Sequence, residues 1–217
     1  MKLAFSTNAF KKYTLQDSIR KISTIGYEGV ELLADIPHAY PPMFGKEQIG
    51  LAINTLSEYK IQVSNLNAFT LYAITDVDCP SWIENDKSLR ELRIQHTINC
   101  IELAQKIGSR NISTEPGGPI EPGVTDTVGL RKLFIDGLNK AAAIAEKKNI
   151  KILIDLTEPN LLLENSSDFL DFMENIDSDY VKLNFDIGHF YCVKEDPAKL
   201  VYRLVDYIEL PFSRHCC

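Results

Sequence analysis

Apolar residues along the chain follow two alternating spacings, and the alternation repeats from one end to the other. Short apolar runs, such as residues 150–156, indicate buried strands. Between these runs, apolar residues recur every three or four positions, as at Leu15, Ile19 and Ile22, which predicts amphipathic helices. The predicted strands are 2–6, 29–33, 61–67, 111–114, 150–156, 181–186 and a seventh that begins at Tyr207, and the predicted helices are 15–25, 46–59, 88–107, 130–148, 167–175 and 197–205.

The order of these elements predicts a parallel sheet. Strand and helix alternate without a hairpin signal, which requires right-handed crossovers in either an open doubly wound sheet or a closed barrel. No strand-to-helix turn carries a nucleotide-binding G-x-G-x-x-G or G-x-x-x-x-G-K pattern. Polar residues instead follow almost every strand, as expected where strand ends converge on one mouth. We therefore predict an α/β fold, a (β/α) TIM-type parallel barrel, whose strand-end residues are Asn8, Glu31, Asn65, Asn67, Glu115, Asp155 and Asp186.

Composition narrows the class of protein. With 217 residues, of which 45% are apolar and 24% charged, the chain is long enough for one large domain with its own core. No apolar run approaches the roughly 20 residues that span a bilayer, and the chain begins directly with a strand, so we expect a cytoplasmic protein without a membrane partner. Five cysteines without paired spacing predict no disulfide framework. A net charge of −7 argues against a nucleic-acid partner.

The most informative stretch is V-K-L-N-F-D-I-G-H, residues 181–189. A buried strand ends here in an aspartate and a histidine three residues apart, with a glycine between them. On a tight turn, Asp186 and His189 can point into one space above the sheet. The alternative is that Asp186 caps the following helix and His189 only packs.

Several segments together carry a family resemblance. They are the opening L-A-F-S-T-N-A-F, the phrase G-Y-E-G-V-E-L-L followed by D-I-P-H, the helix end E-L-A-Q-K-I-G, and N-F-D-I-G-H-F. In this order and spacing, over residues 1 to about 209, the chain resembles the xylose isomerase-like barrels. These form the sugar phosphate isomerase/epimerase superfamily, which also includes endonuclease IV.

The resemblance implies one divalent metal ion, Mn, Mg, Zn or Co, and proton transfer between adjacent carbons of a bound sugar. By position, Asp186 matches the metal-binding aspartate and His189 the histidine that touches substrate. Strand five should supply a glutamate directly after its apolar run, but Asp155 stands there and Glu158 follows three residues later. We predict Asp155 as the first choice of metal ligand and Glu158 as the second, and the same two acids as the catalytic groups. Because an aspartate is one methylene shorter, metal affinity is expected to differ.

Three further residues are candidates for the wall of the mouth. Glu31 and His38, near the end of the second strand, are predicted to contact substrate, although Glu31 also suits an inward polar layer and His38 a loop beside Pro37. Glu115 opens E-P-G-G-P-I-E-P-G, which is either a substrate lid or a rigid connection. His96 lies in the middle of a helix, where a solvated face or a helix contact is expected.

The C-terminus departs from the family pattern. The sequence ends in Y-I-E-L-P-F-S-R-H-C-C, without a recognisable eighth strand, whereas a complete barrel takes about 250 residues. Codons for L-P-F-S-R-H-C-C, read one nucleotide on, can spell the metal-site-like C-H-F-H-D-I-A. We therefore predict one domain over residues 1–209, a C-terminally truncated barrel of about seven strands, followed by an atypical tail at 210–217 that arises from a frameshift after Glu209.

Three functions compete at this point. The first is a metal-dependent sugar or sugar phosphate isomerase or epimerase, working through an enediolate on a small sugar or polyol, or an inactive truncated descendant of one. The second is a non-catalytic barrel that binds a polyol or a partner protein. The third, an endonuclease IV-like nuclease, needs more histidines than the four present and a basic groove. Exposed strand edges also predict that the chain can form a homo-oligomer.

Overall fold

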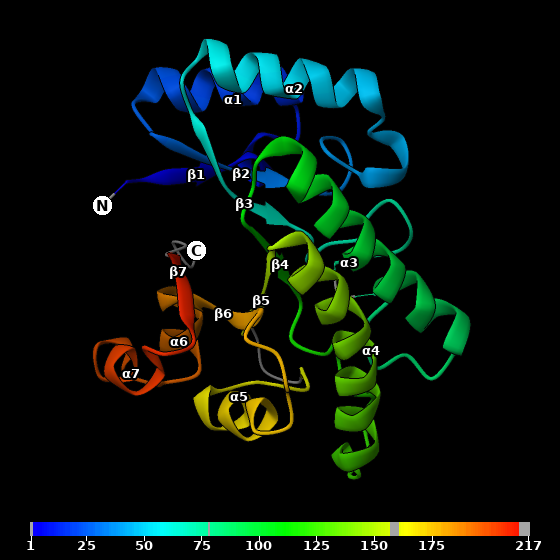
Figure 1. Ribbon diagram of the computed structural model, residues 1–217. Helices are drawn as coiled ribbons and strands as arrows, with labels where there is room; N and C mark the ends of the chain where they lie inside the picture. The colour runs from blue at the N-terminus through cyan, green and yellow to red at the C-terminus, as the bar shows by residue number, and fades with distance from the viewer. Residues whose placement is uncertain (1, 78, 157–160, 213–217) are drawn as a thin grey trace.

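The computed structural model describes residues 2–77, 79–156 and 161–212. Within them, seven strands form one sheet in which every strand pairs in parallel with its neighbours in the sequence (Figure 1). The predicted TIM-type parallel fold is therefore confirmed. The strands are β1 (Ala4–Ser6), β2 (Gly29–Leu33), β3 (Gln62–Asn67), β4 (Asn111–Thr114), β5 (Lys151–Asp155), β6 (Val181–Asp186) and β7 (Ile208–Phe212).

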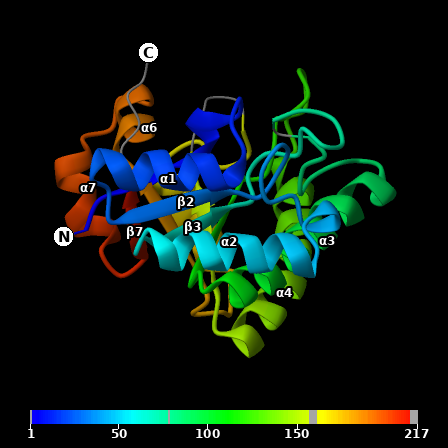
Figure 2. The same cartoon turned by 90° about the horizontal axis from the view of Figure 1, so that it is seen from above.

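Helices connect the strands and lie outside the curled sheet (Figures 1 and 2). The sheet is open among the described residues, since no pairing joins β1 to β7, and these two strands are its edges. The helices are α1 (Leu15–Ile25), α2 (Lys46–Glu58), α3 (Lys87–Ile107), α4 (Thr127–Lys148), α5 (Ser166–Met173), α6 (Ile187–Cys192) and α7 (Pro197–Leu204), with short 3-10 helices η1 (Thr7–Phe10) and η2 (Pro41–Met43).

Local capping explains where the helices begin and end. Thr14 accepts a hydrogen bond from the backbone N–H of Asp17 at the start of α1, and Gly26 ends that helix in a left-handed conformation at φ +108°. Asp126 caps α4, so this helix begins three residues before the predicted Leu130. The predicted helix ranges do not include α6, which follows β6 with no intervening loop and enters the predictions only as the helix that Asp186 would cap.

The two faces of the sheet have different chemistry. Leu32, Leu66 and Ile112 belong to the apolar core that packs under the helices. Side chains alternate between the two faces along a strand. The residues directly before and after each of these three in the sequence therefore point to the inner face of the curled sheet. That inner face is polar near the strand ends, where it carries Glu31, Asn65, Asn67, Ser113, Asp155, Asn184 and Asp186, all of them buried.

The edge strand β1 is much less buried than the central strands. Leu3 is 58% exposed and Phe5 37% exposed, whereas all five residues of β2 are buried. Unpaired strand edges of this kind are sites of association between chains, and the predicted homo-oligomer stays a prediction. At the other edge β7 extends to Phe212, so the first residues of the predicted tail continue the strand, while residues 213–217 lie outside the described part. None of the described helices is both long enough and apolar enough to cross a membrane.

Candidate metal centre

Two aspartates end neighbouring strands of the sheet. Strands β5 and β6 run parallel, and Asp155 pairs in register with Asn184. Asp186 lies two residues further along β6, so its side chain projects from the same face as that of Asn184. The two aspartates are 1% and 0% exposed. The structure therefore brings the two predicted acids together in a buried position at the strand ends.

Asp186 also caps the helix that follows it. Its Oδ1 accepts hydrogen bonds from the backbone N–H groups of Gly188, at 2.8 Å, and His189, at 3.4 Å. These contacts start α6 immediately after β6 and fix the carboxylate plane. Its other oxygen, Oδ2, lies 3.6 Å from Nε2 of His189. The two alternatives drawn from the sequence, a helix cap and a site residue, are thus compatible in one side chain.

His189 turns back from α6 towards both aspartates. Its Nδ1 lies 3.0 Å from the backbone oxygen of Leu156 and 3.6 Å from Oδ1 of Asp155. Since a carbonyl oxygen can only accept, a hydrogen bond at this contact requires the ring proton on Nδ1. In the neutral ring, Nε2, which faces Asp186, then carries the lone pair that a metal ion requires. The contact with Leu156 therefore favours the tautomer of a metal ligand.

Asp155, Asp186 and His189 form a compact donor set. Among the described residues, their ligand atoms all lie within 4.8 Å of one another. Both carboxylate oxygens of Asp155 are buried and accept no hydrogen bond from any described residue. A buried carboxylate without such partners is costly unless a cation neutralises it. Two carboxylates and an imidazole suit divalent ions of the Mn²⁺ or Zn²⁺ kind, so the residues present fit the metal ion implied by the family.

Glu31 lies apart from this cluster, on the inner face of β2. Its Oε2 accepts a hydrogen bond from the side-chain amide of Asn65 at 2.8 Å, and its Oε1 one from that of Asn67 at 3.2 Å. Asn65 also donates to the hydroxyl of Ser113 at 2.9 Å. Glu31 thus belongs to an inward polar layer that crosses three strands. Its predicted contact with substrate stays a prediction.

The other two wall residues are engaged by the protein itself. His38 is buried, with Nε2 3.2 Å from the backbone oxygen of Tyr13, and this burial lowers its pKa. Glu115 is fully buried and accepts hydrogen bonds from the backbone of Trp82 and Gly117. Burial raises the pKa of Glu115 to about 7, against the opposing effect of nearby Arg93. Neither residue joins the donor set of Asp155 among the described residues.

Sequence reasoning missed parts of the inner face. Asn184 and Ser113 are buried there. Asn184 could have been identified from the sequence, because it lies two residues before Asp186 and side chains two apart on a strand point to the same face. The ligand-like tautomer of His189 depends on a backbone carbonyl, which no sequence pattern reports. Glu158, the second choice of ligand and base, lies outside the described residues.

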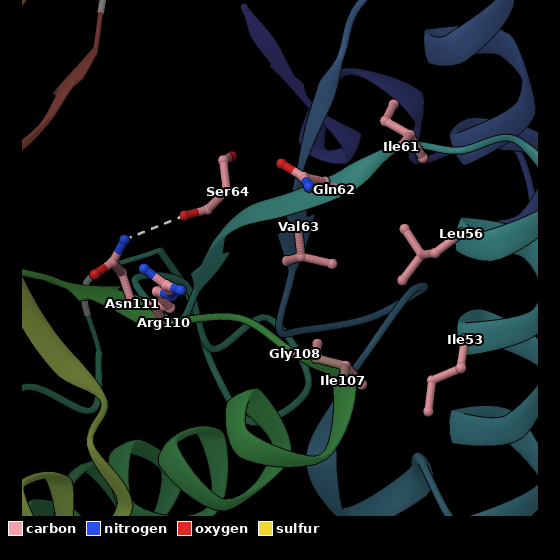
Figure 3. Close-up of a pocket in the computed structure, with 10 residues that line it drawn as sticks. All are labelled: Ile53, Leu56, Ile61, Gln62, Val63, Ser64, Ile107, Gly108, Arg110 and Asn111. Atoms are coloured by element: carbon pink, nitrogen blue, oxygen red, sulfur yellow. Dashed lines mark hydrogen bonds between the residues drawn. The ribbon is translucent and has the colours of Figure 1, made fainter. Parts of the chain in front are cut away.

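A separate hollow of about 540 Å³ opens at the other end of the strands (Figure 3). It lies between α2 and α3, where Gln62 begins β3 and Asn111 begins β4. None of its lining residues is a carboxylate, a histidine or a cysteine, and Arg110 is the charged one among them. This hollow therefore lacks acid–base groups of the kind that Asp155, Asp186 and His189 offer.

His96 makes a helix contact, one of its two expected settings. It is 4% exposed and stacks on Tyr40 with ring centroids 6.1 Å apart. Burial, helped by the charge of Arg93, lowers the pKa of His96 to about 3. In the unfolded chain the group titrates near 6.5.

This difference predicts acid sensitivity. Between pH 6.5 and about 3 the unfolded chain binds a proton that the folded chain does not, so the free energy of unfolding falls by about 1.4 kcal/mol per pH unit as pH decreases. The raised pKa of Glu115 acts in the opposite sense between pH 4.5 and about 7, so the two contributions cancel in the parent between pH 4.5 and 6.5 and only a comparison with a variant separates them. His96→Phe keeps a stacking ring but removes the titration. In urea unfolding at pH 7.5, 6 and 5, the free energy of unfolding of the variant should therefore rise relative to that of the parent as pH falls. A difference between the two that does not change with pH would contradict this assignment.

Comparisons with known proteins agree with the fold. A search of curated proteins finds no match to this chain. Among solved structures, a D-tagatose 3-epimerase-like protein superimposes with a TM-score of 0.79 at 20% identity, covering 98% of this chain and 75% of that one. The IOLI protein with a bound zinc atom gives 0.76 at 16% identity, covering 96% and 70%. A family 2 AP endonuclease from Brucella melitensis gives 0.74 at 15% identity, covering 94% and 75%.

At these identities, the neighbours establish the fold and leave the chemistry to this chain's own residues. A family model described as the xylose isomerase-like TIM barrel matches residues 19–212, which contain β2 to β7 and all three residues of the donor set. Because this match covers most of the chain, the protein belongs to the xylose isomerase-like TIM barrel family.

Proposed function

We propose that this protein is a metal-dependent isomerase or epimerase that moves a proton between adjacent carbons of a small sugar or sugar phosphate. The observation that carries the proposal is the buried donor set of Asp155, Asp186 and His189, in which both oxygens of Asp155 accept no hydrogen bond from the described residues. A solved neighbour of the same fold is described as D-tagatose 3-epimerase-like, and another holds zinc. The first supports a reaction on a sugar and the second a bound divalent ion.

Each residue of the donor set has a distinct role in this proposal. Asp155 and Asp186 would hold the ion, and His189 would complete its ligands through Nε2. Once bound, a divalent ion polarises a carbonyl group and stabilises negative charge on its oxygen. The hydrogen bond from Nδ1 of His189 to Leu156 keeps the ring oriented, and the cap contacts of Asp186 keep its carboxylate oriented.

The proton itself needs a carboxylate as its acceptor. We assign it to an acid at the end of β5, either Asp155 or Glu158, because a carboxylate within hydrogen-bond reach of a carbon-bound proton adjacent to a polarised carbonyl can act as a general base. The prediction that His189 touches substrate is an alternative to its role as a ligand, because Nδ1 contacts Leu156 and Nε2 can serve either the ion or a sugar hydroxyl. Burial of the aspartates, at 1% and 0% exposure, keeps the reacting groups in a medium where charges act strongly.

Hydrogen exchange into sugars tests the proposal without knowledge of the natural substrate. The Mn²⁺-loaded protein is incubated in D₂O with a panel of ketoses and ketose phosphates, and NMR follows the loss of signal at the carbons that flank the carbonyl. We expect deuterium to enter at one such carbon of at least one sugar, and removal of the ion with EDTA to stop the exchange. Binding of Mn²⁺ and of a sugar without any exchange would contradict an isomerase and favour the polyol-binding barrel.

A further inference from the structure

The motif E-P-G-G-P, residues 115–119, has no task in the proposed reaction, yet it follows the strand that pairs with β5, which Asp155 ends. Thr114, the last residue of β4, pairs with Ile154 of β5, so Glu115 follows β4 at the level where Asp155 ends β5. The motif follows β4 and contacts the segments that follow β3 and β5. It therefore links the parts of the chain at the C-terminal ends of β3, β4 and β5.

Glu115 accepts hydrogen bonds from the backbone of the segment after β3 and from the backbone of the motif itself. Its Oε1 accepts a hydrogen bond from the N–H of Trp82 at 3.0 Å, and its Oε2 one from the N–H of Gly117 at 2.6 Å. Trp82 belongs to the long connection after β3, and its indole N–H donates to the hydroxyl of Thr114 at 3.0 Å. With both oxygens occupied and no exposed surface, Glu115 is placed to join these segments, and its predicted contact with substrate stays a prediction.

The positive charge of Arg93 lies close to the carboxylate of Glu115. This arginine of α3 is fully buried, and its Nε lies 3.9 Å from Oε1 of Glu115. Its Nε also donates to the backbone oxygen of Pro80 at 2.8 Å. Its Nη1 donates to the backbone oxygens of Ala68 and Phe69 at 3.0 and 2.9 Å. One buried cation thus holds the connection after β3 near both its beginning and its end.

The two glycines of the motif extend these contacts to the segment after β5. We call the motif, together with its contacts to the segments after β3 and β5, the junction. Both have positive φ, +111° for Gly117 and +72° for Gly118, and a Cβ on Gly118 would come within 2.2 Å of the Cβ of Ser81. The backbone oxygens of Pro116 and Gly118 accept hydrogen bonds from Leu163, at 3.2 Å, and Leu162, at 3.1 Å. These leucines follow β5, so the motif holds the segment that comes after Asp155 in the sequence.

We propose that Arg93 and Glu115 are positioning residues, whose buried ion pair locks this junction and thereby sets the loops around the metal centre. The effect on catalysis depends on the proposed isomerase function, but the effect on loop order and on metal affinity does not. Without the pair, the segments after β3 and β5 lose their shared anchor. Because Asp155 ends β5, the strand that leads to Leu162 and Leu163, its position should then be less fixed and its affinity for an ion lower.

Hydrogen exchange of backbone amides in Glu115→Gln is the first test. The variant keeps the shape of the side chain but removes its charge and replaces one of its two accepting oxygens with an NH₂ group. We expect exchange at Trp82, Gly117 and Leu162 to rise about tenfold or more while Leu183 in β6 keeps its parent rate. The dissociation constant for Mn²⁺ should rise about tenfold. If the parent isomerises a sugar, the KM for that sugar should rise with a smaller change in kcat.

Two further variants make the outcome decisive. Gly118→Ala disrupts the junction sterically and leaves the ion pair unchanged, so it should raise exchange at Leu162 and reproduce the loss of Mn²⁺ affinity, even if Glu115→Gln fails to fold. Glu91 lies on the same helix as Arg93 and forms an exposed ion pair with Lys140. Glu91→Gln removes this pair and should leave every readout at the parent value. Unchanged exchange at Leu162, or unchanged Mn²⁺ affinity, in folded Glu115→Gln and Gly118→Ala would overturn the proposal. A parent that isomerises no sugar, by contrast, would count against the proposed function alone.

Discussion

Replacing Asp186 with asparagine is expected to weaken Mn²⁺ binding by at least about a hundredfold while leaving the protein folded. The reason is the double role of this side chain. An asparagine oxygen can still accept the capping hydrogen bonds from Gly188 and His189, so α6 should form as before. The variant loses the negative charge that attracts the cation beside Nε2 of His189. Isothermal titration with Mn²⁺ measures the change directly.

A matched control separates loss of charge from loss of a cap. Asp196 caps α7 in the same manner, by accepting a hydrogen bond from the backbone N–H of Ala198 at 3.0 Å, but it belongs to no donor set. Asp196→Asn should bind Mn²⁺ like the parent. Equal Mn²⁺ affinity in Asp186→Asn and the parent would show that the ion, if bound, lies elsewhere.

The second large effect concerns Asp35, whose replacement by alanine is expected to lower the free energy of unfolding by about 3–5 kcal/mol. Asp35 is fully buried after β2 and holds the connection that follows β3. Its Oδ2 accepts hydrogen bonds from the hydroxyl of Thr70 at 2.9 Å and the N–H of Tyr72 at 2.6 Å, and its Oδ1 one from the N–H of Ala73 at 3.1 Å. Alanine would leave these donors without that acceptor. Urea unfolding monitored by circular dichroism gives the loss.

The matched control for this variant lies in the same connection. Asp76 also accepts a backbone hydrogen bond, from Val77 at 2.7 Å, but it is exposed, so water replaces the lost contact. Asp76→Ala should therefore change stability by less than about 0.5 kcal/mol. If Asp35→Ala were as stable as Asp76→Ala, buried hydrogen bonds would not be what holds this connection in place.

The strands and their direction could be predicted because their physical signal is local. Apolar runs and helical spacing gave β2, β4 and β6 with the bounds that the structure has, and parallel order follows from the alternation of strands and helices. Strand direction then brings residues that end neighbouring strands to one edge. For that reason Asp155 and Asp186 could be paired from the sequence before any distance was known.

Contacts with the backbone could not be predicted in the same way. Glu115 has the residue type and position of a substrate ligand, yet its oxygens accept from Trp82 and Gly117, which depends on how two loops fold against each other. The same applies to Arg93, whose partners include carbonyl oxygens of residues 68, 69 and 80. Side-chain patterns do not encode such partners, because every residue except proline presents the same backbone groups. The frameshift predicted after Glu209 and the role predicted for Glu158 stay predictions.

The most direct test of the metal centre is a crystal structure of the protein soaked in Mn²⁺, with anomalous scattering used to locate the ion. The account predicts one strong peak within about 2.0–2.3 Å of a carboxylate oxygen of Asp155, a carboxylate oxygen of Asp186 and Nε2 of His189. A fully occupied Mn²⁺ ion bound elsewhere, or no peak between the two aspartates at saturating Mn²⁺, would contradict it.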